Sequence, residues 1–231
     1  MSFNFTYAAE LKKRFNCYGH FYSIKFPDNK FIPCRSVLEI VDKNINPLNP
    51  DKLWLHKPDA VVIMMNPGSS YPIHPEQEDI RYFSEDFNNL KNLVLTRPDN
   101  TQYQIMRVAK EMKWSHVRVL NLSDIRNSKS SSFISQVEDL NKNFKDNIHS
   151  IFCAKRGEEC KVGLNSMNKN VILGWGQNIN LVPLAKICFK RIYNHNIVKV
   201  ESDVHKFLNA HPSPMLQKKK EEWLMNVIKQ L

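Results

Sequence analysis

The sequence predicts an α/β fold, a three-layer α/β/α sandwich in which helices cover both faces of a central, mostly parallel four-stranded sheet. Three observations support this prediction. Short apolar runs alternate with longer segments of helical periodicity, the order that successive βα units produce. The run at 60–65 is continuous and rich in β-branched residues, as expected for a strand buried on both faces, and three more runs behave similarly. Each run ends in a polar cluster, and parallel sheets bind ligands beyond the carboxyl ends of their strands.

The segment before this pattern has a different character. Residues 19–41 predict a β-hairpin, with GHFYSIKF and KFIPCRSVLEIV on either side of a turn at Pro27-Asp28-Asn29. The proline-studded stretch INPLNPDKLWLHKPD that follows is typical of a connector. We therefore expect residues 1–55 to form an N-terminal β-hairpin extension and residues 56–231 to form the main domain.

Four strands and four helices are expected in the main domain. The strands are 60–65, 116–122, 170–175 and 204–210. Helical patterns lie between and after them, at 101–113, 135–151, 181–193 and about 217–230. The strands end at NPGSS, NLS, GWG and HPSP, and this shared placement predicts one site that draws on all four strand ends.

Composition narrows the classes of function. The chain has 231 residues, and 33 Lys plus Arg against 23 Asp plus Glu give a formal net charge of +10. This length can bury a sizeable core, and a hydrophobic fraction of 42% excludes a disordered chain. No apolar run reaches the roughly 18 residues of a membrane span, and the N-terminus lacks the layout of a signal peptide. The positive surplus points to nucleic acid as a partner, with an inert basic surface as the alternative.

The cysteines indicate a reducing compartment. There are five, an odd number without a CxxC pair, which argues against a disulfide framework and for the cytoplasm. Cys153 and Cys160 are too loosely spaced for a zinc or iron–sulfur motif. We expect five ordinary thiols and no metal site.

Taken in order, the four strand ends resemble the motif series of the uracil-DNA glycosylase superfamily. They are VIMMNPGSS, VRVLNLSDIRNS, VILGWGQN and NAHPSPML, and the resemblance runs from about Asp59 to the C-terminus. The chain is also similar to a bacterial domain family of uncharacterised function with the same MNP, NL, GWG and HP layout. The superfamily resemblance implies an enzyme that flips a base out of DNA, hydrolyses its N-glycosidic bond without a metal or cofactor, and leaves an abasic site.

Two residues match catalytic positions of the superfamily. His211 matches the histidine that donates a hydrogen bond to the departing base, and a histidine that caps a strand end is the alternative. Asn66 matches the position of the water-activating aspartate in the uracil-specific branch, but an amide can only orient water and cannot take its proton. Candidates for the missing acid are Glu78, Asp79 and Asp124, which are otherwise ordinary solvated carboxylates.

Further matches concern the base. Asn121 matches the asparagine that binds a pyrimidine edge, where its amide suits uracil or thymine in one orientation and cytosine in the other; satisfying a loop backbone is the alternative. Gly68 replaces a tyrosine that blocks the pyrimidine 5-position in the uracil-specific branch, so the pocket should accept a methyl group or something larger. The alternative is that an unusual backbone angle requires glycine. Tyr71 or Phe83 is expected to stack on the flipped base or to pack in the core.

Other residues are expected to contact DNA. Met215 follows HPSP, where the superfamily inserts an apolar wedge into the duplex. Hydroxyl and amide groups that could bind phosphates belong to Ser69, Gln177 and Ser213. Lys218 and Lys219 would add electrostatic attraction, and a solvated helix face is the alternative.

These matches predict a cytoplasmic DNA glycosylase that is monofunctional, because the motifs place no lysine nucleophile. Gly68 and the missing aspartate favour an enlarged or modified pyrimidine, such as the glucosylated hydroxymethylcytosine of some phage DNA, and hence a role in antiviral defence. Three alternatives remain: repair of uracil or mispaired thymine, a non-catalytic nucleic-acid-binding module, and a small-molecule α/β hydrolase or nucleotide enzyme. Substrate strandedness and oligomeric state are not predicted.

Overall fold

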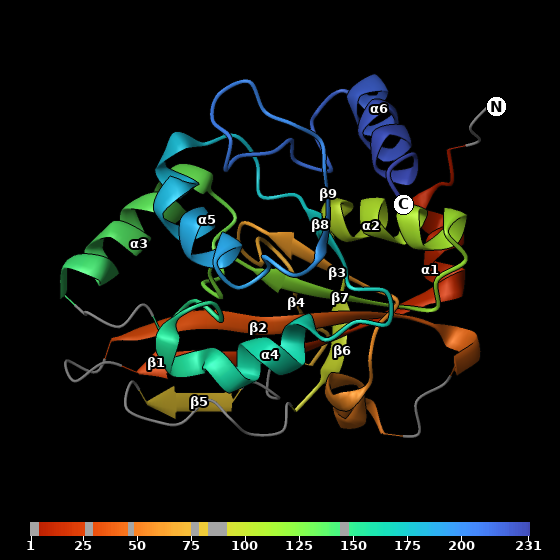
Figure 1. The fold of residues 1–231 in the computed structure, drawn as a ribbon. Helices are drawn as coiled ribbons and strands as arrows, with labels where there is room; N and C mark the ends of the chain where they lie inside the picture. Colours follow the sequence, from red (N-terminus) through yellow and green to blue (C-terminus); the bar gives the residue numbers. More distant parts are fainter. Residues whose placement is uncertain (1–4, 26–29, 46–48, 75–78, 83–91, 144–147) are drawn as a thin grey trace.

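The computed structural model describes residues 5–25, 30–45, 49–74, 79–82, 92–143 and 148–231. Within these residues, a mixed sheet of nine strands forms the centre of the fold (Figure 1). The order across the sheet is β4-β6-β1-β2-β7-β3-β8-β9, and β5 pairs with β1 outside this path. The strands are β1 (Phe15–Lys25), β2 (Phe31–Asp42), β3 (Ala60–Met64), β4 (Tyr71–Pro72), β5 (Asp79–Tyr82), β6 (Val94–Arg97), β7 (His116–Asn121), β8 (Asn170–Leu173) and β9 (Asn196–Lys199).

The α/β class is confirmed, but the predicted four-stranded parallel sheet is wrong. The parallel strands β7, β3, β8 and β9 form only one half of the sheet. The hairpin of β1 and β2 continues it, because β2 pairs antiparallel with β7 from Leu38↔Val119 to Val41↔His116. β2 is buried along nearly its whole length. Its side chains therefore need packing partners on both faces, which a position inside the sheet provides.

The fourth parallel strand is not the predicted one. β9 pairs with β8 at the sheet edge, whereas residues 204–210 form turns, and Asn209 makes an isolated bridge with Glu201. Val204 is 55% exposed while Leu208 is fully buried, so this apolar run is not buried along its length as a central strand would be. The prediction of a strand at 204–210 is therefore wrong.

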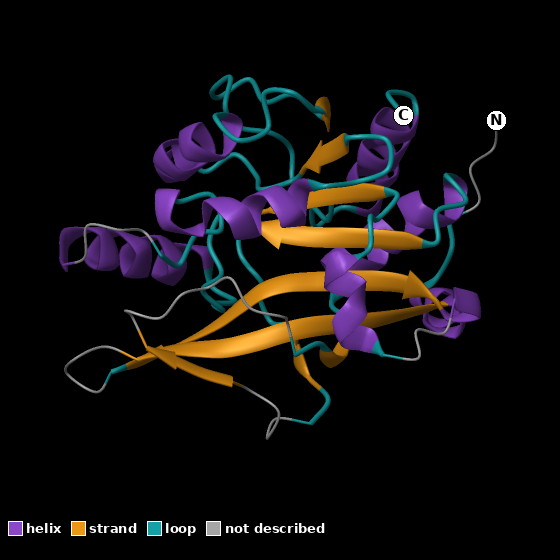
Figure 2. Cartoon of the chain, turned by 60° about the horizontal axis from the view of Figure 1, so that its bottom comes forward, coloured by secondary structure: helices purple, strands orange, loops and turns teal. Residues whose placement is uncertain are grey.

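Helices cover both faces of the sheet (Figure 2). Along β3, Val61 and Ile63 join one apolar cluster while Val62 and Met64 join the other, so the two clusters lie on opposite faces. The first cluster includes residues of α3 (Ser130–Asn143), α4 (Gly157–Leu164) and α5 (Val182–Phe189), and the second includes residues of α1 (Ala8–Arg14), α2 (Asn100–Glu111) and α6 (Gln217–Ile228). The sequence predicted helices α2, α3, α5 and α6, although the ends of each differ from the predicted ones. It did not predict α1 and α4. Short 3-10 turns lie at Lys43–Ile45, Pro50–Leu55, Ala154–Arg156 and Ile179–Leu181.

A β-bulge in β2 changes which face its first residues occupy. His20 pairs with Val37, whereas the next residue, Phe21, pairs with Arg35, so Ser36 has no partner in β1. Cys34 and Val37 would lie on opposite faces of a regular strand, but both pack in the same cluster. The bulge therefore turns the Arg35 side chain to the opposite face of the sheet from Cys34. Asn121, the last residue of β7, lines the same cavity as Arg35 on that face.

A buried ionic network ties the connector to the sheet. Arg118 of β7 donates through Nε to Glu39 of β2 at 2.7 Å, and both side chains are fully buried. Its Nη2 group donates to the backbone carbonyls of Leu53, Trp54 and His56 at 2.9 to 3.1 Å. One side chain thus satisfies several carbonyls of the 50–56 segment and fixes it against β7.

Two further observations concern the described residues. The five cysteines are all buried and form no disulfide. Among the helices in these ranges, none is both long and apolar enough to cross a membrane.

Candidate functional site

Several predicted site residues meet at a cavity of about 210 Å³. Its walls come from the carboxyl ends of β3 and β7, from β2 and from the start of α2. The predicted residues that line it are Asn66, Gly68, Ser69, Asn121 and His211. The cavity therefore lies where the sequence placed a site, beyond the carboxyl ends of parallel strands.

Two backbone carbonyls hold the side chain of Asn66. Its Nδ2 group donates to the carbonyl oxygens of Ile125 at 3.2 Å and Asn127 at 2.7 Å. Because carbonyls only accept, the NH2 group must face them, and Oδ1 remains as an acceptor. An acceptor held in this way can orient a water molecule but cannot remove its proton.

Asn121 is buried without partners. It is the last residue of β7 and pairs with Met64 of β3. Its side chain is 0% exposed, and neither Nδ2 nor Oδ1 has a hydrogen-bond partner among the described residues. An unsatisfied buried polar group costs about 1–3 kcal/mol, so a donor and an acceptor left open beside a cavity indicate a ligand that completes them.

His211 is held in one neutral tautomer. The backbone N–H of Ser213 donates to His211 Nδ1 at 3.1 Å, so the ring proton resides on Nε2. Burial lowers the pKa of His211 below its ordinary value of 6.5 and outweighs the raising effect of the Asp99 carboxylate. At neutral pH the imidazole is therefore uncharged and keeps Nε2–H as a donor.

Gly68 forms an open part of the wall. Its φ of +64° lies in the left-handed region, so the backbone alone gives a reason for glycine. A Cβ built there would meet a single described atom within 4 Å, Asp99 Oδ2 at 3.5 Å. The space beside Gly68 thus extends to the Asp99 carboxylate.

Two charged residues of this cavity were missed by the sequence analysis. Asp99 caps α2 through Oδ1, which accepts from the N–H groups of Thr101 at 2.8 Å and Gln102 at 3.2 Å. The D-x-x-Q pattern before a helical segment is a signal that could have found it. Arg35 lies in β2 and is 1% exposed. A charged residue inside an otherwise apolar strand pattern is the sequence signal that could have identified it.

One of the two aromatic predictions falls outside this cavity, and the other falls outside the described residues. Tyr71 lies in β4, is 40% exposed and is not part of the lining. Its hydroxyl accepts a hydrogen bond from Arg97 Nη1 at 2.9 Å. Phe83 lies outside the described residues.

Of the three candidate acids, only Asp124 has a described side chain, and it does not line the cavity. Glu78 is outside the described residues, and Asp79 is in β5, which pairs with β1. Asp124 is fully buried, where it accepts hydrogen bonds from Tyr22 Oη at 2.8 Å and Arg156 Nη1 at 2.6 Å. Asp124 therefore belongs to a structural ion pair rather than to a solvated surface.

Apart from Ser69, the predicted DNA-contacting residues are not part of the lining of the first cavity. A second cavity of about 400 Å³ shares this histidine and is lined by Gln177 and Lys219. Met215 is 98% exposed, and Lys218 is exposed in the first turn of α6. Ser213 is half-buried. Ser213, Met215, Lys218 and Lys219 follow His211 closely in the chain, and we call these four residues the rim.

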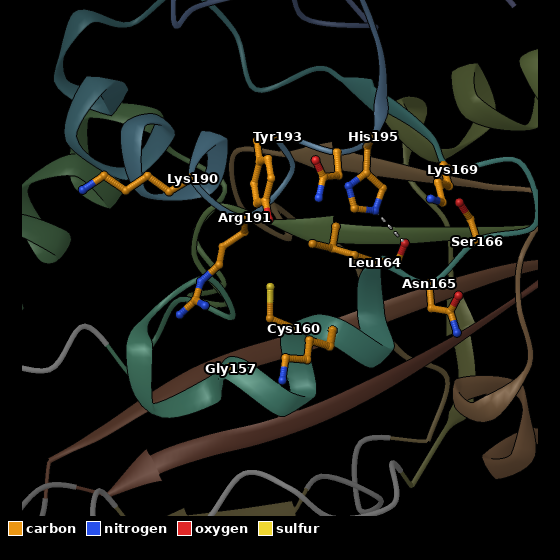
Figure 3. Close-up of a pocket in the computed structure, with 12 residues that line it drawn as sticks. Gly157, Cys160, Leu164, Asn165, Ser166, Lys169, Lys190, Arg191, Tyr193 and His195 are labelled. Carbon is orange, nitrogen blue, oxygen red and sulfur yellow. Dashed lines mark hydrogen bonds between the residues drawn. The ribbon is translucent and has the colours of Figure 1, made fainter.

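A third cavity, of about 440 Å³, lies elsewhere on the fold (Figure 3). α4 and the segment between α5 and β9 line it, and His195 Nε2 lies 3.3 Å from the carbonyl oxygen of Leu164. Lys169 and His195 directly precede β8 and β9, so this cavity is at the amino ends of these strands. It contains none of the predicted site residues.

Gly174 allows the loop that carries His211 to approach the sheet. A Cβ at this position would lie 2.7 Å from Pro212 Cγ and 3.0 Å from Met64 Sδ. We expect Gly174→Ala to displace the rigid proline ring and to lower the free energy of unfolding by about 1–3 kcal/mol. The measurement is urea unfolding followed by circular dichroism.

Gly157→Ala is the matched control for this prediction. Gly157 is helical, and a Cβ there would meet no described atom within 4 Å. Its replacement should leave stability unchanged or raise it by about 0.5–1 kcal/mol. Equal stabilities of the two variants would show that the close approach at Gly174 has no energetic consequence.

Comparison of the chain with protein-family models, with curated proteins and with solved structures finds no match in any of the three.

Proposed function

We propose that this protein is a DNA glycosylase that removes a flipped pyrimidine. The observation that carries the proposal is Asn121, whose buried amide offers an unpaired donor and an unpaired acceptor at the cavity. A pyrimidine presents the complementary pair of groups on one edge, and a base extruded from DNA is recognised through that edge. The resemblance of the four sequence motifs to the uracil-DNA glycosylase superfamily supports the same assignment.

The proposed reaction uses two further polar residues of the cavity, His211 and Asn66. The C1′–N1 bond breaks, and its electron pair moves onto the base. The neutral His211 donates from Nε2–H to the oxygen on which negative charge develops. Asn66 Oδ1 orients the water that adds to C1′, and the proton that this water loses goes to the departing base. No acid beside Asn66 is required, because the reaction is accelerated mainly by the hydrogen bond from His211 that stabilises the departing base.

The preferred substrate is an enlarged pyrimidine. A side chain at Gly68 would contact Asp99 Oδ2 at 3.5 Å from its Cβ, so its absence leaves additional room in the cavity for a substituent at the pyrimidine 5-position. We favour a hypermodified cytosine, such as glucosylated hydroxymethylcytosine, and a role in defence against phages that carry it. Uracil or mispaired thymine is the alternative substrate, because the free amide of Asn121 suits either class of pyrimidine after a flip.

The proposed partner is DNA, held by the rim around His211. The formal net charge of +10 favours a polyanion. Lys218 and Lys219 are exposed at the start of α6, next to Met215, the proposed wedge. A methionine that is 98% exposed can fill the space that a flipped nucleotide leaves.

Alkali cleavage of defined oligonucleotides tests this function. Duplex and single strands would each carry one uracil, mispaired thymine, hydroxymethylcytosine or glucosylated hydroxymethylcytosine. We expect strand cleavage at the modified cytosines, because alkali breaks DNA at abasic sites. Cleavage only at uracil or thymine would support the repair alternative, and DNA binding without cleavage would support a non-catalytic module.

A further inference from the structure

Arg35 differs from the other fully buried arginines described in this chain. Arg118 and Arg156 each meet a carboxylate, that of Glu39 at 2.7 Å and that of Asp124 at 2.6 Å. Arg35 is equally buried, yet its Nε and Nη1 atoms have no hydrogen-bond partner in the part of the chain that the structure describes. A buried charge without a partner is costly, so its presence at a cavity points to a ligand group that accepts hydrogen bonds.

The guanidinium of Arg35 keeps its charge in this position. Burial lowers the pKa of Arg35 to about 10, and the nearby Asp99 opposes this shift, so the group is still protonated at neutral pH. The β-bulge at Ser36 turns Arg35 to the face where Asn121 lies, and both residues line the same cavity. The cavity thus contains a fixed positive charge close to the proposed base-recognition residue.

Asp99 supplies the opposite charge without neutralising Arg35. Its Oδ1 atom is occupied by the cap of α2, while Oδ2 has no hydrogen-bond partner among the described residues. Oδ2 is the atom nearest to the open wall at Gly68. The two side chains line one cavity but form no ion pair with each other. A donor and an acceptor therefore face a shared space.

This arrangement selects for one kind of ligand group. A hydroxyl can accept from the guanidinium and donate to the carboxylate at the same time. A carboxylate on the ligand would be repelled by Asp99, and an ammonium group would be repelled by Arg35. A methyl group would leave both charges unsatisfied in a buried site. Among these groups, only a hydroxyl satisfies both residues.

We infer that Arg35 and Asp99 together bind a hydroxyl group on the substituent at the pyrimidine 5-position, in the space beside Gly68. This inference rests on the proposed function and specifies its substrate class: pyrimidines with a hydroxyl-bearing substituent, such as a hydroxymethyl or glycosyl group. Arg35 and Asp99 are then the specificity-determining residues, and His211 and Asn66 carry the reaction.

The ratio of two release rates tests the inference. Wild-type protein, Arg35→Met, Arg35→Lys and Asp99→Asn are compared on DNA that contains 5-hydroxymethylcytosine or 5-methylcytosine. Asparagine preserves the helix cap, so Asp99→Asn removes the charge and replaces the Oδ2 acceptor by an NH2 donor. We expect the hydroxymethyl-to-methyl ratio of kcat/KM to fall at least tenfold in Arg35→Met and Asp99→Asn, mainly through KM, and less in Arg35→Lys. Equal losses on both bases, or an unchanged ratio, would overturn the inference.

Thermal stability gives a readout that does not depend on activity. Because Arg35 Nε and Nη1 have no hydrogen-bond partner among the described residues, Arg35→Met should melt at or above the wild-type temperature. Arg118→Met is the matched control and should melt well below it, since it removes the partner of Glu39. An equally large drop in Arg35→Met would identify Arg35 as a structural residue and overturn the inference.

A nucleoside-binding experiment separates this inference from the proposed function. If the wild-type protein releases no base, the proposed function fails, and the melting temperature is then measured with 5-hydroxymethyl-2′-deoxycytidine or 5-methyl-2′-deoxycytidine. The inference expects a stabilising shift with the hydroxymethyl nucleoside only, absent in Arg35→Met and Asp99→Asn. No shift in the wild type, or the same shift in the variants, would overturn it.

Discussion

Replacing His211 by alanine is expected to lower the rate of base release by on the order of 10²–10³, the usual effect of removing one donor from a developing anion. The Nδ1 atom of His211 is held by the Ser213 N–H, so Nε2–H is the donor that alanine removes. The measurement is single-turnover base release from a substrate oligonucleotide. A loss mainly in the rate of the chemical step, with DNA binding retained, is the expected pattern.

The pH dependence of base release follows from the protonation of His211. The pKa of His211 is lowered by burial, so the neutral donor persists below pH 6.5. Base release should therefore stay level as the pH falls from 8 to 6.5 and decline only at lower pH, where the imidazole becomes charged. A profile that rises on acidification would mean that a protonated histidine is the active form.

His205→Ala is the matched control. His205 accepts a hydrogen bond at Nδ1 from Phe207 N at 3.2 Å, the same local arrangement as in His211, but it does not line the cavity. Replacing His205 by alanine should change the rate of base release by less than about twofold. If both variants lost activity equally, the effect would arise from the loop rather than from the donor.

Arg118→Met is expected to lower the free energy of unfolding by about 3–5 kcal/mol, because it leaves the Glu39 carboxylate buried with its main partner removed. Burial alone would raise the pKa of Glu39, but Arg118 and then His116 outweigh it and hold this pKa below the ordinary value of 4.5. The carbonyls of the 53–56 segment also lose their donor. Urea unfolding measures the change.

A surface pair provides the contrast for this prediction. Lys161 and Glu158 are 73% exposed, so Lys161→Met should change stability by no more than about 0–1 kcal/mol. A double variant, Arg118→Met with Glu39→Met, should recover part of the lost free energy of unfolding. The double variant removes both charges, so Glu39 is no longer a buried charge without its main partner. A change below about 1 kcal/mol in Arg118→Met would contradict the structural role of this network.

The fold was predictable where strands are buried on both faces. β3, β7 and β8 coincide with continuous apolar runs, and the polar residues after β3 and β7 meet as expected. β9 was missed because its sequence, NIVK, is short and partly exposed. The pairing of β2 with β7 joins segments far apart in the chain. Periodicity within a segment does not encode such pairing, so the size of the sheet could not be predicted.

The site was predictable in its strand-end residues and not in its charged walls. Asn66, Asn121 and His211 follow motifs and share one cavity. Arg35 faces that cavity because a bulge displaces the register of β2, and Asp99 reaches it because a helix begins there. Both depend on tertiary placement, which a linear pattern of residues does not show.

The central claim is that the unpaired amide of Asn121 binds a flipped pyrimidine that the protein then releases. Mass spectrometry of free bases tests it most directly, with unmodified DNA, uracil-containing DNA and phage DNA rich in glucosylated hydroxymethylcytosine as substrates. Wild-type protein is predicted to release the modified cytosine. Asn121→Leu is predicted to release none while unfolding at a similar urea concentration, because the amide has no partner to lose. Absence of any released pyrimidine with the wild type, or equal release by Asn121→Leu, would contradict the account.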